Sequence, residues 1–365
     1  MEFIHFAYTL VFLFLLFGVT VYNGFNYQSK NSNRSDIPHH SKSKLSLIIA
    51  AKNEEQNIVP LINSLEKLNY RKEDFEVVII DDNSTDKTAE FFQQEIKVKS
   101  NYKMIRAIDK KLDAKKGALA IGIEEAQHNL IVITDADCEP ESKWVSAFAS
   151  SLDYGYDFVF GVSPIRSGKK LVEKISAFEN LRNSFLTISA VGLNIPYSAT
   201  ARSFGFRKKS FEHVGGYSNT EETISGDDDL LLREAVRNKM LIGTVIDPEA
   251  FVYTAAPKNF SEYFKQKKRH LQTSFYYLLK QKLFLAFWHI INLVSLFSIF
   301  LIFVTPILVL PFGVKLIYDL FIVVKYQKKL GHNFKFYEIF YLQILFELFI
   351  IINFLNSLFG KSEWK

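Results

Sequence analysis

Two carboxylates one residue apart stand at the end of an apolar run near the middle of the chain. Asp135 and Asp137 follow Leu130–Thr134, which is short, apolar and rich in β-branched residues. Such a run predicts a buried strand of a parallel sheet. Ligands of open α/β sheets bind beyond the carboxyl ends of the strands. Carboxylates held there suit a hard divalent cation that also binds substrate phosphates, although a second acidic run at Asp227–Asp229 shows that so short a pattern also arises by chance.

Other polar clusters follow or flank apolar runs. Leu45–Ala50 ends shortly before Glu54, and Phe75–Ile80 ends in Asp81 and Asp82. For the second cluster an Asx-rich turn is as good an explanation as a binding site when the pattern is taken alone. The remaining clusters contain Lys115, the acidic run Asp227–Asp229, and the trio Gln266, Arg269 and His270.

Alternating strands and helices position these clusters. Strands are predicted at Leu45–Ala50, Phe75–Ile80, Tyr102–Ile105 and Leu130–Thr134, with helices at Glu54–Leu68, from about Asp86, and at Ala114–Gln127. This alternation predicts βαβ units and a parallel sheet. After Pro140 the pattern is looser, with strands expected at Asp157–Gly161 and Ser203–Arg207 and helices at Leu171–Val191 and Asp228–Asn238.

Composition points to a membrane. Hydrophobic residues make up 48% of the chain and 35 residues are Phe. Residues 3–22 carry no charge and are long enough to cross a bilayer. No basic segment precedes them and no cleavage site follows, which disfavours a removed signal peptide. Residues 283–324 fit a hairpin of two further spans and Tyr337–Phe359 fits one more, which places the end of the chain outside.

Charge fixes the expected orientation. Basic residues after the first span and in the loop 325–335 place both segments in the cytoplasm. The expected organisation is a transmembrane helix at 1–22, a linker at 23–43, a catalytic domain at 44–259, a basic aromatic segment at 260–282, and a membrane region with about three helices at 283–365. The basic aromatic segment is expected in the headgroup region, or as an ordinary surface helix.

Charge and cysteine content exclude some classes of protein. The net charge of +5 is small and spread along the chain, so no nucleic-acid partner is expected. The one cysteine, Cys138, excludes an intramolecular disulfide, which agrees with a reducing compartment.

The order and spacing of the motifs resemble the family 2 glycosyltransferases, inverting enzymes with a GT-A fold that use nucleotide sugars. The resemblance covers roughly residues 44–272 and rests on LSLIIAAKNEE at 45–55, VVIIDDNSTDKT at 77–88, KKGAL at 115–119, DAD at 135–137, ISGDDDLLLR at 224–233 and QKKRH at 266–270. It is greatest with membrane-attached members that have one leading span and a few trailing ones. It implies a Rossmann-like, mostly parallel catalytic sheet with transmembrane helices at both ends.

The resemblance also implies a reaction. A sugar would pass from a nucleoside diphosphate sugar, a UDP-sugar being the expected donor, to a hydroxyl of a lipid, lipid-linked or polysaccharide acceptor. This would take place at the cytoplasmic face of a bacterial inner membrane, in contact with membrane lipids. The alternatives are a processive polysaccharide synthase that also extrudes its product, and a non-catalytic membrane scaffold that retains the fold.

The same resemblance assigns roles to the donor-binding residues. Glu54, Asp81 and Asp82 would hold the base and ribose, since carboxylates accept hydrogen bonds from ring N–H groups and ribose hydroxyls. Lys115 would lie near the nucleotide. Asp137 is the expected direct ligand of Mg²⁺ or Mn²⁺, with Asp135 contacting the nucleotide sugar or the metal.

The acidic run and the basic trio complete the expected site. Asp228 would be the general base and Asp227 would stand for the family's Glu, although the alignment can be shifted by one residue. Crowded carboxylates raise each other's pKa, whereas an acidic helix N-terminus is the structural alternative. Gln266, Arg269 and His270 correspond to Gln-x-x-Arg-Trp with His in place of Trp, and Arg269 can bind phosphate oxygens bidentately.

Overall fold

The computed structural model describes residues 1–32, 37, 41 and 43–359, which form two compact units. The first unit contains residues 1–28, 167–196 and 256–359. The second contains residues 29–166 and 197–255. The chain therefore enters each unit more than once.

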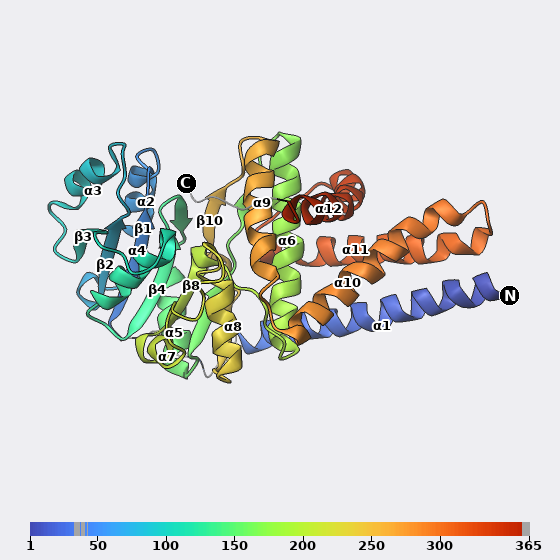
Figure 1. The fold of residues 1–365 in the computed structure, drawn as a ribbon, viewed down its shortest axis with the longest axis horizontal. Helices are drawn as coiled ribbons and strands as arrows, with labels where there is room; N and C mark the ends of the chain where they lie inside the picture. Colours follow the sequence, from blue (N-terminus) through green and yellow to red (C-terminus); the bar gives the residue numbers. More distant parts are fainter. Residues whose placement is uncertain (33–36, 38–40, 42, 360–365) are drawn as a thin grey trace. The chain divides into compact units, whose positions relative to one another are not determined.

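The second unit is built on a seven-stranded sheet, as far as the described residues go, in the order β3-β2-β1-β4-β8-β6-β9 (Figure 1). Strands β1 to β4 pair in parallel, β8 is antiparallel to β4 and β6, and β9 is parallel to β6. The prediction of a mostly parallel α/β sheet is confirmed. The strands are β1 (Leu45–Ala51), β2 (Phe75–Asp81), β3 (Tyr102–Arg106), β4 (Leu130–Asp135), β6 (Phe158–Gly161), β8 (Phe204–Arg207) and β9 (Ile242–Val245).

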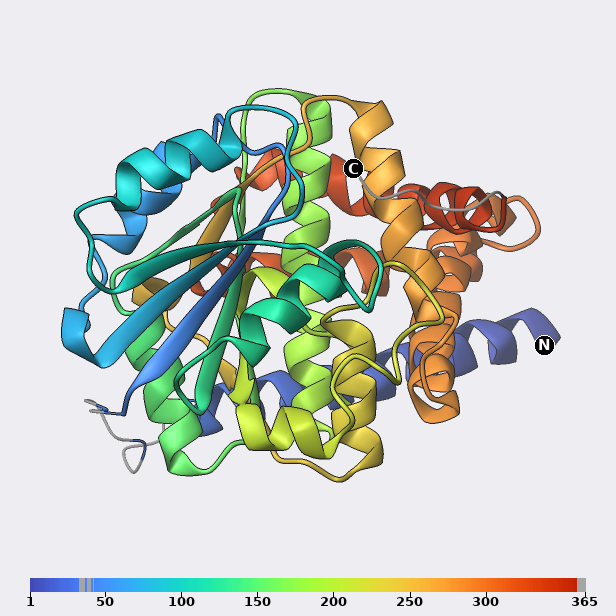
Figure 2. The same ribbon diagram turned by 60° about the vertical axis from the view of Figure 1, so that its left-hand side comes forward.

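The register of the central strands gathers the predicted site at one edge of the sheet. Ala50 of β1 lies opposite Asp135 of β4, and Ala51 lies opposite Asp81 of β2. Because these strands are parallel, their carboxyl ends point the same way (Figure 2). The loops that follow them are therefore neighbours, as the sequence predicts.

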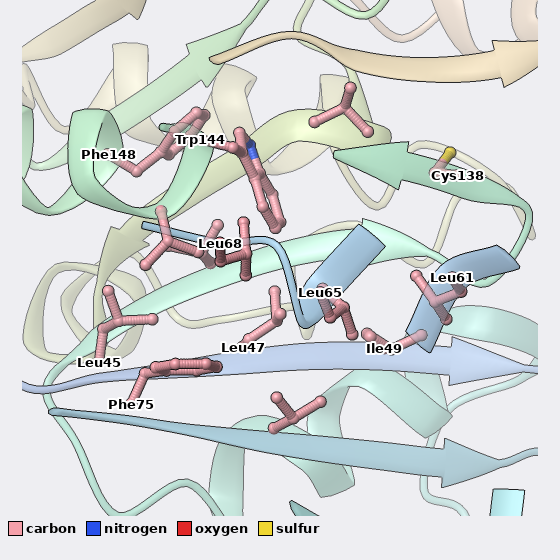
Figure 3. Packing of buried hydrophobic residues seen from close by; sticks show 14 of the residues in the cluster. Leu45, Leu47, Ile49, Leu61, Leu65, Leu68, Phe75, Cys138, Trp144 and Phe148 are labelled. Carbon is pink, nitrogen blue, oxygen red and sulfur yellow. The ribbon is translucent and has the colours of Figure 1, made fainter. Parts of the chain in front are cut away.

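Helix α2 (Ile58–Leu65) covers the face of β1 with four buried residues at helical spacing: Ile58, Leu61, Ile62 and Leu65. Leu47 and Ile49 of β1 point toward Leu61 and Leu65 in the core (Figure 3). The helix begins later than the predicted Glu54. The reason is a turn in which Asn53 has φ 56° and its side-chain oxygen accepts a 2.8 Å hydrogen bond from the backbone N–H of Thr85.

The other helices of this unit are α3 (Thr88–Ile96), α4 (Ala114–Glu124), α5 (Trp144–Tyr154), α7 (Lys208–His213) and α8 (Asp229–Arg237). Among them α4 and α8 match predicted helices within a few residues at each end, and α3 begins within a few residues of the predicted start at about Asp86. Helices α5 and α7 and strand β9 are additions. So is a small sheet of the described residues in the order β5-β10-β7, made of β5 (Cys138–Pro140), β10 (Val252–Ala255) and β7 (Ile165–Arg166).

The first unit is helical. Its helices are α1 (Glu2–Asn31), α6 (Leu171–Gly192), α9 (Phe260–Ser274), α10 (Leu279–Phe297), α11 (Val309–Tyr326) and α12 (Phe336–Ser357). Four segments of the described chain are long and apolar enough to cross a membrane: Glu2–Asn31, Leu279–Leu301, Pro306–Tyr326 and Phe336–Ser357. The expectation of apolar helices at both ends of the catalytic sequence is confirmed.

Helix α1 is longer than the span predicted at residues 1–22 and runs through part of the predicted linker at 23–43. Packing accounts for the extension. Phe25 is fully buried and stacks on Phe185 with ring centroids 4.9 Å apart, and the hydroxyl of Tyr326 donates a 2.7 Å hydrogen bond to Asn26. The rest of the predicted linker includes residues 33–36, 38–40 and 42, which lie outside the described residues.

Candidate active site

Acidic residues at the ends of β1 and β2 form the first part of the site. Asp81 accepts a 3.2 Å hydrogen bond from the backbone N–H of Ser84. Asp82 is only 3% exposed, and its Oδ1 pairs with Lys110 at 2.6 Å. The other oxygen, Oδ2, is buried with no hydrogen-bond partner among the described residues. A buried oxygen of this kind costs free energy unless a ligand satisfies it, so Asp82 fits a donor group on a bound molecule.

Glu54 lies beside these residues in the turn after β1. Its side chain accepts a 2.6 Å hydrogen bond from the amide of Asn57, and its backbone N–H donates to Thr88 at 2.7 Å. The turn is thereby fixed to the start of α3. Glu54, Asp81 and Asp82 are all nearly buried, which holds three carboxylates at one edge of the sheet.

The side chain of Lys115 lies between Asp135, at the end of β4, and the acidic run Asp227–Asp229. Its ammonium lies 2.6 Å from Asp135 and 2.7 Å from Asp227. Burial alone lowers the pKa of Lys115, but the two carboxylates outweigh it and the pKa is raised overall. Lys115 is therefore a permanent cation between two groups that are 92 positions apart in the sequence.

The backbone before α4 explains how a lysine is placed there. Ala114 has φ 52°, a left-handed conformation that costs free energy for a residue with a side chain. A Cβ at Gly117 would lie 2.0 Å from the carbonyl oxygen of Leu112, so only glycine fits the approach of that loop. The Lys115-Lys116-Gly117 sequence thus forms a tight start to α4, and the second lysine donates to the carbonyls of Thr220 and Thr223.

Asp135, Asp137 and Cys138 have ligand atoms within 4.8 Å of one another. The Cys138 thiol donates to Asp137 at 3.5 Å. Burial, with the nearby charges of Asp137 and Asp135, raises the pKa of Cys138 well above its usual range. A neutral thiol is a poor ligand for Mg²⁺ or Mn²⁺, whereas two carboxylates at a strand end, with Asp137 exposed, suit such an ion. The donor set fits a hard divalent cation held by the carboxylates.

The three carboxylates before and at the start of α8 have different partners. Asp227 is paired with Lys115. Asp229 accepts hydrogen bonds from the Ser198 hydroxyl at 2.7 Å and from the Ala199 backbone N–H at 3.1 Å, so it fixes the preceding loop. Asp228 accepts 2.7 Å hydrogen bonds from the backbone N–H groups of Asp229 and Ala201 and caps the helix.

Asp228 has the electrostatic setting of a base. Burial of its carboxyl, together with the negative charges of Asp229 and Asp227, raises its pKa well above the usual range, and the Lys115 charge opposes this only in part. The residue nevertheless keeps partial exposure. A carboxylate with raised proton affinity and a path to solvent can accept a proton from a substrate hydroxyl.

Tyr217 ends the segment Val214–Tyr217, whose sequence resembles the segment that lines the donor-sugar and acceptor pocket of family 2 glycosyltransferases. It is 2% exposed and its hydroxyl has no hydrogen-bond partner among the described residues. Burial and the charge of Asp227 raise its pKa, so the hydroxyl is a neutral donor. It follows Gly215 and Gly216, which both have positive φ. The Gly-Gly-Tyr sequence was the available signal, but it fits an ordinary turn equally well.

The basic trio belongs to the other unit. Gln266, Arg269 and His270 lie on α9, in the first unit, whereas the remaining predicted site residues lie in the second. Their role therefore stays a prediction from the sequence.

Part of the chain matches a known protein family. Residues 46–215 match the family model described as Glycosyl transferase family 2. The beta-monoglucosyldiacylglycerol synthase of Nostoc sp. (strain PCC 7120) is 29% identical over 205 residues, which cover 52% of this chain and 40% of that protein. A probable glycosyltransferase, YdaM of Bacillus subtilis (strain 168), is 27% identical over 300 residues, covering 77% and 66%. The chain thus spans well under two thirds of the first of these relatives.

The fold also has a counterpart among solved structures. A mannosyltransferase from Pyrobaculum calidifontis, in complex with GDP-Man and Mn²⁺, superposes with a TM-score of 0.55 at 14% identity, covering 96% of this chain and 99% of the other. At this identity the likeness concerns the fold alone. It agrees with the GT-A fold expected from the motifs.

Proposed function

Because residues 46–215 belong to glycosyl transferase family 2, we propose that this chain is an inverting glycosyltransferase. It transfers a sugar from a nucleoside diphosphate sugar to a hydroxyl group of a lipid, a lipid-linked sugar or a polysaccharide. The four apolar helices of the same chain support an acceptor presented at a membrane. We further propose the inner membrane of a bacterium, with catalysis on the cytoplasmic side, where nucleotide sugars are made.

One observation carries this proposal: Lys115 bridges Asp135 and Asp227 within 2.7 Å of each. It holds the strand end suited to a nucleotide diphosphate against the acidic run suited to a general base. If the acidic run only began helix α8, it would not need a buried lysine that also pairs with Asp135 of strand β4. The arrangement supports one reaction centre assembled from both segments.

The donor would bind across the ends of β1, β2 and β4. Asp82, with its unsatisfied Oδ2, would accept a hydrogen bond from the base, and Asp81 and Glu54 would hold the ribose or base. UDP is the expected nucleotide. Asp137 and Asp135 would hold Mg²⁺ or Mn²⁺, which when bound would neutralise charge on the departing diphosphate.

Asp228 would take the proton from the acceptor hydroxyl as its oxygen attacks the anomeric carbon. The new carbon–oxygen bond forms on the face opposite the bond to the diphosphate, which leaves with its electron pair, so the anomeric configuration inverts. Lys115 pairs with Asp227 and Asp135, so these two carboxylates would not take up the proton. Asp227 thereby acts on orientation and proton affinity, not as the base.

A panel of nucleotide sugars tests this function directly. The detergent-purified protein is incubated with UDP-, GDP- and other nucleoside diphosphate sugars, with membrane lipid extract as acceptor and with Mg²⁺ or Mn²⁺. We expect release of the nucleoside diphosphate from one donor class, dependent on acceptor and abolished by chelator. Binding of none of the donors by the folded protein would contradict the proposal.

A further inference from the structure

Helix α12 runs in a different direction from the other apolar helices of its unit. In Figure 1, α1, α10 and α11 lie along the picture, whereas α12 is seen nearly end-on. In the turned view of Figure 2, α12, in dark red, lies along the picture. The sequence alone predicted a further span here, because Phe336–Ser357 is long and apolar enough to cross a membrane.

Near both of its ends, α12 contacts helices that are not candidate spans, namely α6 and α9. In its first turn Glu338 pairs with Lys174 of α6 at 2.6 Å. Toward its end Asn353 donates to the hydroxyl of Tyr263 of α9 at 2.9 Å, and the carbonyl of Ser357 accepts from Gln272 of α9 at 3.1 Å. Helix α12 therefore crosses from α6 to α9 along its length.

A span in this position would have different neighbours. Helix α11 ends at Tyr326 and α12 begins at Phe336, so the connection is short. Two spans joined by a short loop pack antiparallel, which would put the last turns of α12 beside the first turns of α11, at Val309. The last turns of α12 instead contact α9.

The middle of α12 is fixed where it crosses α11. Glu347 lies 3.0 Å from Lys315, which pairs with Asp319, and Asp319 also binds Arg182 of α6 at 2.6 Å. All four side chains are nearly or fully buried. Breaking a buried ion pair leaves an uncompensated charge in the interior, which is strongly unfavourable, so this cluster holds α12 across α11 and α6.

The buried and exposed faces of α12 differ in the polar residues that they carry. Its buried side carries Gln343, Glu347 and Asn353 beside apolar residues, which are Ile339, Leu342 and Phe346. Its exposed side is an apolar stripe at helical spacing: Phe340, Ile344, Leu348, Ile352 and Leu355, each 37–51% exposed. Lipid is the partner that fits this stripe, because the stripe is continuous with a unit whose other apolar helices are candidate spans.

We propose that α12 does not cross the bilayer but lies in its surface, with the apolar stripe in the acyl region and the buried face, which carries the polar residues, against α6 and α9. Three helices, α1, α10 and α11, then form the spans of the described chain. The chain after α12 stays on the same side of the membrane as the loop at 327–335. This inference does not depend on the proposed function.

Immersion depth distinguishes the two orientations. Single cysteines replace Phe340, Leu348 and Leu355 in the full chain, carry nitroxide labels in liposomes, and are compared for access to oxygen and to a polar relaxant. Cys138 is 1% exposed and serves as the background control. A surface helix gives three similar depths. A span would separate Phe340 and Leu355 by about 22 Å along the membrane normal, since the rise is about 1.5 Å per residue, with Leu348 deepest.

Matched controls on α10 calibrate this measurement. Leu283, Ile290 and Phe297 are exposed residues seven positions apart on a helix assigned as a span, so successive depths should differ by about 10 Å. A depth profile on α12 like that on α10 would overturn the proposal. Labels on α12 that neither lipid-dissolved oxygen nor the polar relaxant reaches would also overturn it, because a second copy of the chain would then cover the stripe.

A reporter fusion tests the topology with no substitution in α12. A reporter after Lys365 should be found on the same side as one inserted in the loop at 327–335. Opposite sides would show that α12 crosses the membrane.

Discussion

Replacing Lys115 by Met keeps the length of the side chain and removes the charge that separates Asp135 from Asp227. Since the ammonium lies 2.6 Å from one carboxylate and 2.7 Å from the other, the two oxygens are at most about 5.3 Å apart. Two unit charges at this distance repel by about 3 kcal/mol at an effective dielectric constant of about 20. This free energy is released on unfolding in the variant.

The expected consequence is a large loss of thermal stability in the catalytic unit. For a domain of this size, about 3 kcal/mol lowers the unfolding midpoint by roughly 6–12 °C. Tryptophan fluorescence in detergent reports the transition, because Trp144, one of the three tryptophans of the chain, is fully buried in the sheet core. The double variant Lys115→Met/Asp227→Asn should regain most of the loss, because only one of the two carboxylates remains charged.

A surface pair provides the matched control. Lys143 pairs with Glu249 at 2.5 Å, but the two side chains are 44% and 60% exposed, and such pairs contribute about 0–1 kcal/mol. Lys143→Met should therefore shift the midpoint little. The reasoning about the bridge is refuted if Lys115→Met is no less stable than Lys143→Met, or if the double variant is no more stable than Lys115→Met.

Three further predictions concern the metal, the base and the membrane. Asp137→Ala should remain folded but lose the Mg²⁺- or Mn²⁺-dependent part of nucleotide binding, measured by calorimetry; undiminished turnover would exclude its metal role. The acid limb of the kcat/KM profile should lie above the ordinary aspartate pKa of about 3.9, because the pKa of Asp228 is raised and the base works deprotonated; a limb at or below that value would argue against Asp228. Reporters after Lys44 and in the loop at 325–335 should both be cytoplasmic, and a periplasmic result after Lys44 would contradict the orientation.

Much of the catalytic sheet could be predicted because its strands are buried on both faces. Strands β1, β2 and β4 are mostly apolar and almost entirely buried, and polar residues stand at or shortly after their ends. The parallel register then brings these ends together. The small second sheet could not be predicted in this way. Its strand β5 is Cys138–Pro140, only three residues long, and it pairs with β10 more than 100 positions later.

The sequence predicted the residues of the site but not the ion pairs between them. The sequence motifs indicated Lys115, Asp135 and Asp227 separately. Their bridge depends on a left-handed Ala114 and a close approach at Gly117, which no periodicity reports. Lys110, which pairs with Asp82, gave no signal because it lies in a basic loop that resembles a solvated surface.

The orientation of α12 could not be predicted from the sequence for a different reason. Length does not separate a helix that crosses a bilayer from one that lies in its surface, and by hydropathy α12 is a candidate span. The difference is in the partners of Glu338, Asn353 and Ser357, which lie far away in the sequence. The prediction of a fourth span was therefore reasonable from the sequence, and α12 is assigned otherwise only through its contacts.

The transfer rates of Asp228→Asn and Asp227→Asn test the central claim most directly. Asparagine keeps the size and most hydrogen bonds of aspartate but cannot accept the proton. With Asp228 as the base, Asp228→Asn should bind the donor as the unaltered protein does and transfer sugar about 10²–10⁴-fold more slowly, while Asp227→Asn should be affected less. The reverse ranking would make Asp227 the base, and near-normal rates in both variants would contradict the account by leaving the acidic run as a helix start alone.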